Sequence, residues 1–374
     1  MEAMFGMGRI VPWPSNAPET GPRGVAVLTG RIDAMRASAR SLTAPRRRDT
    51  VRPALAPPTR DRTPVITSIQ PAMPHAAPAY AGRPVDATAR VIVTVDTVGY
   101  RVPSAVFVGR VHSTFAQACN FDCGDTLLTL AGGGAGNGPT LLRLAAAPRD
   151  LRRVFDVGEP VRGGAGALQS ARAEVRWPHA RMWRPAHRTV RLAQARIDDH
   201  LGCAAAHLAR LRAQRSSVVE HAAAATVTAL LAACRQSDGR RAAAHAARLV
   251  GWGEGLTPAG DDFLVGLCAG LDAQIDGNLA RRACRDAIGS AMVASTPRTT
   301  TISAHYLRLA AAGHFQERLL AARDALLSSE SPQQCDEALR AACAVGATSG
   351  ADSVAGLLAG LTVWPAAGAC DGAA

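Results

Sequence analysis

The sequence predicts an α+β protein in which a small, mostly antiparallel β domain precedes a larger helical domain. Between residues 89 and 176, short β-branched segments alternate with Gly/Asn-rich breaks, as strands and turns do. From about residue 190 onward, Ala and Leu recur at helical spacing. We therefore divide the chain into a leader (1–88), a β-rich domain (89–190) and a helical domain (191–374).

The leader differs in composition from the rest of the chain. It holds 13 of the 23 prolines, and few of its apolar residues recur at helix or strand spacing. Such a segment cannot bury enough surface to offset chain entropy, so we expect it to be disordered. Residues 1–90 also carry 13 Arg and 6 acidic residues, within a chain whose net charge is +12. A basic arm for nucleic acid is the alternative, but the rest is only mildly basic and we do not expect nucleic acid as a partner.

Cysteine usage and hydropathy indicate a cytoplasmic protein without a membrane partner. The nine cysteines form no C-x-x-C pair, and most lie among Ala and Leu as small buried hydrophobes do. This pattern favours a reducing compartment and argues against a disulfide framework or a zinc site. No apolar stretch reaches the roughly 18 residues of a membrane helix, and the first residues lack the order of a signal peptide.

The β domain offers two candidate substrate contacts. Strands are expected at 90–98, 106–111, 126–130, 140–144 and 173–177. His112 directly follows the second of these segments, and Asn137 lies in the glycine-rich break at 132–139. Neighbouring residues on a strand point to opposite faces, so His112 and Ser113 are not expected to belong to a catalytic triad.

The helical domain is expected to hold its chemistry in the breaks between helices. The helices are expected at 191–215, 218–235, 240–249, 261–275, 279–293, 302–326, 333–344 and 352–362. The most distinctive break is GWGEGLTPAGDDF at 251–263, in which Thr257 would cap a helix that starts at Pro258. Its alternating glycines indicate close backbone approach or several positive φ angles. A glycine-rich turn before a helix N-terminus can bind an anion, and a plain tight turn is the alternative. The candidates here are Gly253, Gly255, Thr257, Gly260, Asp261 and Asp262.

A second segment resembles the first within this chain. Residues 262–271 and 352–361 both read D-x-x-x-G-L-x-A-G-L, and G-x-T precedes each of them. Glycines four apart let two helices approach closely, so we interpret the pair as an internal loop–helix repeat. Two unrelated Ala/Gly-rich helices are the alternative. The candidates here are Thr348, Ser349 and Asp352.

A third segment, STPRTTTISAH at 295–305, places one arginine among hydroxyl residues at the start of a helix. A guanidinium fork and short hydroxyl donors suit a phosphate or a carboxylate. The candidates are Arg298, Thr299, Thr300 and Ser303, and a hydroxyl-rich capping loop is the alternative. His305 could act as an acid or a base. A capping or helix-surface histidine is the alternative for it.

Taken together, these three motifs resemble the AllH-like family. The resemblance rests on G-x-G-x-G-L-T-P-x-G-D-D-F, R-T-T…S-A-H-Y-L and G-x-T-S-G-x-D, and it covers about residues 97–365. It implies a subunit of the bacterial oxamate carbamoyltransferase of anaerobic allantoin breakdown, in purine catabolism. That enzyme has three different subunits and exchanges oxalurate plus phosphate with oxamate plus carbamoyl phosphate. Partner subunits and a small anionic substrate (carbamoyl phosphate, oxamate or oxalurate) are therefore implied.

The residues are compatible with carbamoyl transfer. That reaction needs clamps for phosphate and carboxylate, and donors for a tetrahedral oxyanion. The helix N-termini near 257 and 349, together with Arg298, could supply them. We expect Asp262 to face the site, because Asp352 repeats its position, and to orient the carbamoyl nitrogen or hold Mg²⁺. No other cofactor and no metal cluster is expected. A non-catalytic anion-binding or scaffold subunit is the alternative function.

Overall fold

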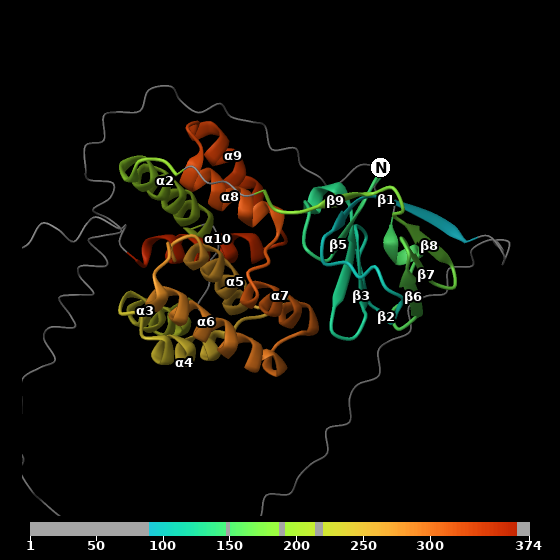
Figure 1. Ribbon diagram of the computed structural model, residues 1–374, viewed down its shortest axis with the longest axis horizontal. Helices are drawn as coiled ribbons and strands as arrows, with labels where there is room; N and C mark the ends of the chain where they lie inside the picture. Colours follow the sequence, from blue (N-terminus) through green and yellow to red (C-terminus); the bar gives the residue numbers. More distant parts are fainter. Residues whose placement is uncertain (1–89, 147–149, 187–190, 214–219, 365–374) are drawn as a thin grey trace, which may run out of the picture. The chain divides into compact units, whose positions relative to one another are not determined.

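The computed structural model describes residues 90–146, 150–186, 191–213 and 220–364, and shows an α+β chain (Figure 1). The described residues belong to one compact unit, Thr88–Ala374. The expected α+β class is confirmed. The prediction of a disordered leader over 1–88 lies outside the described residues.

The first part of this unit is a closed barrel of mixed strand direction. Its strands are β1 (Val91–Gly99), β2 (Phe107–Thr114), β3 (Ala118–Asp122), β4 (Leu127–Ala131), β5 (Leu141–Leu144), β6 (Pro160–Gly164), β7 (Ala167–Gln169) and β8 (Ala173–Arg176), with β9 (Arg181–Trp183) added beside β1. The order is β5-β4-β3-β2-β6-β7-β8-β1, and pairing of β1 with β5 closes the ring. β1 runs parallel to β8 and β9, and β4 parallel to β5, while the other paired strands are antiparallel.

The barrel closes around an apolar interior. Along β1 the burial alternates, with Val93 and Val95 inside and Thr94 and Asp96 outside, as a sheet with one buried face requires. Phe121 on β3 meets Phe155 edge to face at 5.3 Å between ring centroids. The outer faces of the strands are therefore free to carry polar side chains.

The second part is helical. The helices are α2 (Gln194–Ala213), α3 (Glu220–Arg235), α4 (Gly239–Leu249), α5 (Ala259–Asp272), α6 (Leu279–Ala294), α7 (Thr301–Ala311), α8 (Glu317–Ser328), α9 (Pro332–Cys343) and α10 (Ser349–Thr362). The single helix expected at 302–326 is wrong, because the chain breaks after α7 at Gly313, whose φ is 77°. In the described part of the chain, no helix is long and apolar enough to cross a membrane.

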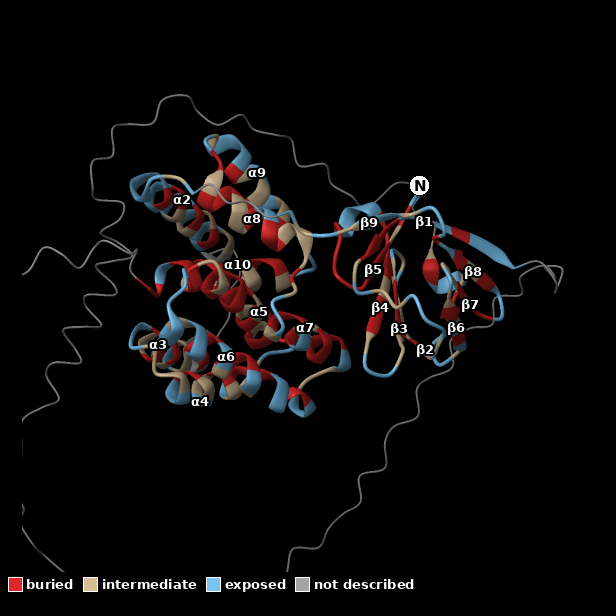
Figure 2. Ribbon diagram, in the orientation of Figure 1, coloured by how far each residue is buried: buried red, intermediate tan, exposed pale blue. Residues whose placement is uncertain are grey.

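Helices α5 and α10 lie against each other at the centre of the helical part, and both are largely buried (Figures 1 and 2). A Cβ added to Gly266 of α5 would collide with the backbone of Ser353, and one added to Gly356 of α10 would collide with the backbone of Phe263. Gly266 and Gly356 occupy the same position in the two motifs, and each lies against the backbone of the other helix. The internal repeat stays a prediction, which this reciprocity favours.

Side chains also connect the barrel to the helices. The Tyr100 hydroxyl after β1 lies 2.8 Å from Nδ1 of His314, which precedes α8. Glu317 at the start of α8 accepts 2.8 Å hydrogen bonds from both the backbone and the side-chain amide of Asn137. These bonds attach the start of α8 to the loop after β1 and to the loop between β4 and β5.

Candidate functional site

The glycine-rich loop before α5 adopts the backbone that its glycines predict. Gly251, Gly253 and Gly255 have φ angles of 74°, 108° and 94°, a region that other residues rarely occupy. The helix begins at Ala259, and Pro258 rather than Thr257 is its N-cap. The expected capping role of Thr257 is therefore wrong, and its hydroxyl instead lies 2.6 Å from that of Ser349, at the start of α10.

Asp261 fastens three segments of the chain to one another. Its side chain is almost fully buried and accepts hydrogen bonds from the backbone N–H of Gly251 at 2.8 Å, the Thr299 hydroxyl at 2.5 Å and the Ser303 hydroxyl at 2.6 Å. Both carboxylate oxygens are thus occupied. This residue holds the glycine-rich loop against the start of α7.

Asp262, the next residue, is also buried but has a free acceptor. Its side chain is 8% exposed, and its Oδ2 atom has no hydrogen-bond partner among the described residues. Burial raises the pKa of this carboxyl to about 7, although hydrogen bonding to Ser349 and Thr257 lowers it, and the charges of Asp352 and Asp261 add to the rise. Asp262 can therefore hold or release a proton near neutral pH.

The start of α10 brings the second motif to the same place. Thr348 is the N-cap of this helix, Ser349 is its first residue, and Asp352 lies in its first turn. Two helix N-termini and their first-turn carboxylates thus surround the hydroxyls of Thr257 and Ser349. The positive ends of the helix dipoles favour negative charge here, while burial opposes it.

The third motif mainly braces the other two. The Thr300 hydroxyl caps α7 by accepting from the N–H of Ser303, and donates to the Leu256 carbonyl at 2.5 Å. The exposed Arg298 directs its guanidinium to α4, where it donates to the carbonyls of Ala247 at 2.8 Å and Val250 at 3.3 Å. Gly260 belongs to the same packing, because a Cβ there would collide with the Leu249 carbonyl.

His305 faces the barrel. Its Nδ1 accepts from the backbone N–H of Leu127 at 3.3 Å, so the proton of the neutral ring lies on Nε2, which is 2.9 Å from the Thr140 hydroxyl. Burial, with a smaller effect of Arg308, lowers the pKa of His305 to about 4. Both ring nitrogens are occupied, and the ring is neutral at physiological pH.

On the barrel, a β-bulge corrects one prediction. The register between β2 and β3 shifts between Val111 and Ser113, and His112 is the extra residue. His112 Nδ1 consequently lies 3.1 Å from the Ser113 hydroxyl, although an unbulged strand would point the two side chains apart. The expectation that the two side chains point to opposite faces was therefore wrong, whereas the expectation that they form no triad is not tested by this contact. Asn137 contacts α8, and its Oδ1 is buried without a partner among the described residues.

A polar chain, not found from the sequence, extends from this bulge. The Asn120 amide donates to the Ser113 hydroxyl at 3.0 Å, and the Thr129 hydroxyl donates to the Asn120 carbonyl oxygen at 2.8 Å. Thr129 also hydrogen-bonds the phenol of Tyr306, whose pKa is raised by burial and further by the charge of Asp262. In the sequence, the sign of this chain is the polar residues Asn120 and Thr129 within the otherwise largely apolar strands β3 and β4. It was missed because β3 was not expected to be a strand.

Comparison with known families agrees with the two-part architecture. A family model described as "Oxamate carbamoyltransferase subunit AllH" matches residues 249–361, which hold all three helix-start motifs. A second, described as "AllH family N-terminal domain", matches residues 92–182, the barrel. No curated protein and no solved structure matches the chain. The two models together cover more than half of the sequence, and the chain therefore belongs to the AllH family, the oxamate carbamoyltransferase subunit family.

Proposed function

We propose that this chain supplies the acid–base group and part of the substrate site of a multi-subunit carbamoyltransferase. The observation that carries the proposal is Asp262, a buried carboxyl near the N-termini of α5 and α10 with one oxygen that no described residue hydrogen-bonds. The family description supports the reaction class and the need for partner subunits. The substrates we assign are oxamate, oxalurate and carbamoyl phosphate.

The chemistry requires one proton to move at nitrogen. A phosphate oxygen attacks the carbamoyl carbon of oxalurate, a tetrahedral oxyanion forms, and the carbon–nitrogen bond then breaks. The departing nitrogen of oxamate takes up a proton, and in the reverse direction it loses that proton as it attacks carbamoyl phosphate. A carboxyl whose pKa is about 7 suits both steps, since general acid–base catalysis works best near the operating pH.

The surroundings of Asp262 provide the remaining contacts. In its ionised form the free Oδ2 can accept a hydrogen bond from a carbamoyl N–H. The hydroxyls of Thr257 and Ser349 and the helix N-termini can donate to an oxyanion. The other motif residues are assigned to holding these groups in place: Asp261, Arg298, Thr299, Thr300, Ser303 and His305. The proposal includes no Mg²⁺.

The test compares Asp262→Asn with Asp352→Asn in the chain assembled with its partner subunits. We expect Asp262→Asn to lower kcat by about 10²–10⁴-fold, the usual contribution of a general acid–base group, and Asp352→Asn to have a smaller effect. Thermal shifts of the isolated chain with carbamoyl phosphate and with oxamate report binding separately. Undiminished turnover in Asp262→Asn would refute the catalytic role and favour a scaffold subunit.

A further inference from the structure

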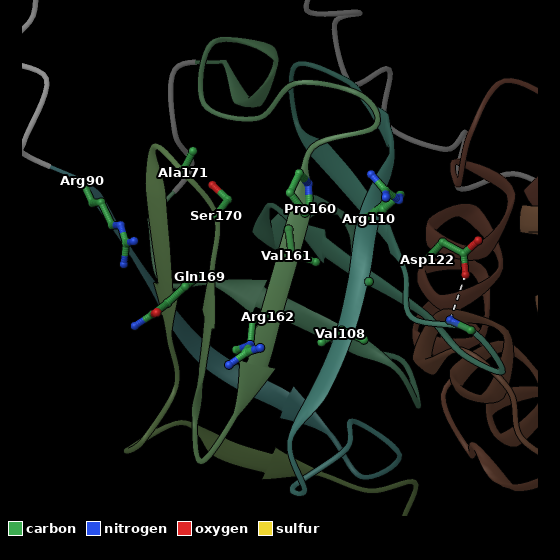
Figure 3. A pocket seen from close by; sticks show the side chains of 12 residues that line it. Arg90, Val108, Arg110, Asp122, Pro160, Val161, Arg162, Gln169, Ser170 and Ala171 are labelled. Atoms are coloured by element: carbon green, nitrogen blue, oxygen red, sulfur yellow. Dashed lines mark hydrogen bonds between the residues drawn. The ribbon is translucent and has the colours of Figure 1, made fainter.

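Away from Asp262, the outer face of the barrel carries a wide groove. It has a volume of about 750 Å³ and lies over β2, β6 and the adjoining strands (Figure 3). The strand register places Val108 opposite Arg162 and Arg110 opposite Pro160, so these four side chains share one face. Arg90, before β1, lines the same groove.

The groove combines positive charge with exposed apolar surface. Arg90, Arg110 and Arg162 are exposed, and none makes an ion pair with another described residue. Val108 is 64% exposed, and the nearby Val106 is 77% exposed. Large apolar side chains that stand open beside unpaired arginines are typical of a surface that a partner covers.

Two acidic groups, Asp122 and Glu174, lie near these arginines, and neither forms an ion pair with Arg90, Arg110 or Arg162 among the described residues. Asp122 accepts a 3.0 Å hydrogen bond from the backbone of Gly124, as the dashed line in Figure 3 shows. Glu174, on β8, pairs with Arg176 at 2.8 Å. Asp122 keeps its negative charge and offsets part of the positive charge, but three arginines line the same groove, so the groove stays positive for a binding partner.

The charge of the groove and the side chains that line it indicate which kind of molecule binds there. The leader is basic and a second copy of the chain carries a net charge of +12, so both would be repelled. Nucleic acid is disfavoured because no aromatic ring lines the groove for base stacking. We propose that the groove docks an acidic segment of a partner subunit of the carbamoyltransferase, with apolar side chains that cover Val108.

The proposal depends on the assembly that the family description implies, but not on the role of Asp262. The test mixes the full chain with the remaining subunits of the enzyme and measures Kd and complex mass by light scattering. Arg110→Glu/Arg162→Glu should raise Kd at least tenfold, and Arg110→Gln/Arg162→Gln should raise it less. Arg240→Glu/Arg282→Glu, exposed arginines on α4 and α6, should leave it unchanged. Binding of the wild type should weaken as salt rises.

Three results would overturn the proposal. The wild type could fail to bind those subunits, or the charge-reversed chain could bind as tightly as the wild type. The groove could also bind a single-stranded RNA oligonucleotide that the charge-reversed chain does not bind. The thermal shift with carbamoyl phosphate, measured on each isolated variant, separates these results from a failure of the site at Asp262.

Discussion

Asp261 and Asp262 are neighbours in the first turn of α5, but their carboxyl groups have opposite surroundings. Asp261 accepts from three donors on two other segments, whereas one oxygen of Asp262 has no partner among the described residues. A buried carboxylate with donors on both oxygens is stabilising, and one with a free oxygen is costly. The two residues should therefore respond differently to substitution.

We expect Asp261→Ala to lower the free energy of unfolding by about 3–5 kcal/mol, because it leaves several buried donors without an acceptor. Asp262→Asn should not lower it at pH 7 and should increase it, because the amide carries no charge into the buried site. Urea denaturation of both variants measures the difference. Equal losses would show that the two carboxyls share one structural role.

The titration of Asp262 should make stability depend on pH. Burial raises its pKa from 3.8 to about 7, so the folded state binds the extra proton in this range. The contribution to stability is full below about pH 4 and is lost as pH rises through 7, by roughly 4 kcal/mol for about three pH units. Relative to the wild type, Asp262→Asn should gain stability between pH 4 and pH 8 in urea titrations.

His305 should show the opposite dependence. Burial lowers its pKa from 6.5 to about 4, so its contribution is full above pH 6.5 and is lost as pH falls through 4. In the wild type this loss and the gain from Asp262 oppose each other. His305→Gln should gain stability relative to the wild type as pH falls from 7 to 4. A pH-independent difference would contradict the neutral ring seen against Leu127 and Thr140.

At the scale of elements, the crossing of α5 and α10 should tolerate no side chain at its contact points. Gly266→Ala and Gly356→Ala should each destabilise the chain by about 1–3 kcal/mol, because the new Cβ meets the backbone of the other helix. Gly202 in α2 is the matched control, since a Cβ there meets nothing within 4 Å. Gly202→Ala should stabilise by roughly 0.5–1 kcal/mol, as measured by urea denaturation. Equal effects at all three positions would contradict the close packing.

The elements that the sequence predicts best are those with a strong local period. The long helices and strands such as β1 and β4 were expected close to their observed bounds, whereas β3, β6, β7 and β9 were missed. Barrel closure depends on pairing of β1 with β5 and β8, segments far apart in the chain. No local pattern encodes such a pairing. The break between α7 and α8 was missed because one glycine is a weak signal within a helical pattern.

The same limit applies to the site. The three loops were chosen from their glycines, hydroxyls and aspartates, and the structure joins two of them through Asp261 and two through Thr257 and Ser349. The direction of a long side chain is not encoded locally, so the contacts of Arg298 with α4 could not be foreseen. The bulge at His112 depends on the β3 partner and was equally hidden.

For the whole molecule, the bonds between barrel and helices predict joint unfolding. Asn137 with Glu317, Tyr100 with His314, and the two contacts of His305 would all break if either part unfolded alone. Far-UV circular dichroism and tryptophan fluorescence should therefore report one common melting temperature for the described unit. Two separated transitions would show that barrel and helices are independent folding units.

The arrangement around Asp261 has a consequence for how sequence variation in this family should be interpreted. In the first turn of α5, Asp261 holds the surrounding loops and Asp262 faces the site. Most substitutions near this turn that abolish activity should therefore act by destabilising the fold, and the cell should degrade such variants. In a mutational scan that records abundance beside activity, positions 251, 261, 299 and 303 should lose both signals together. Substitutions at position 262 should abolish activity while the protein accumulates normally. The scan would thus distinguish the residue that acts in the reaction from the residues that hold the fold, and it needs no structure with a bound ligand.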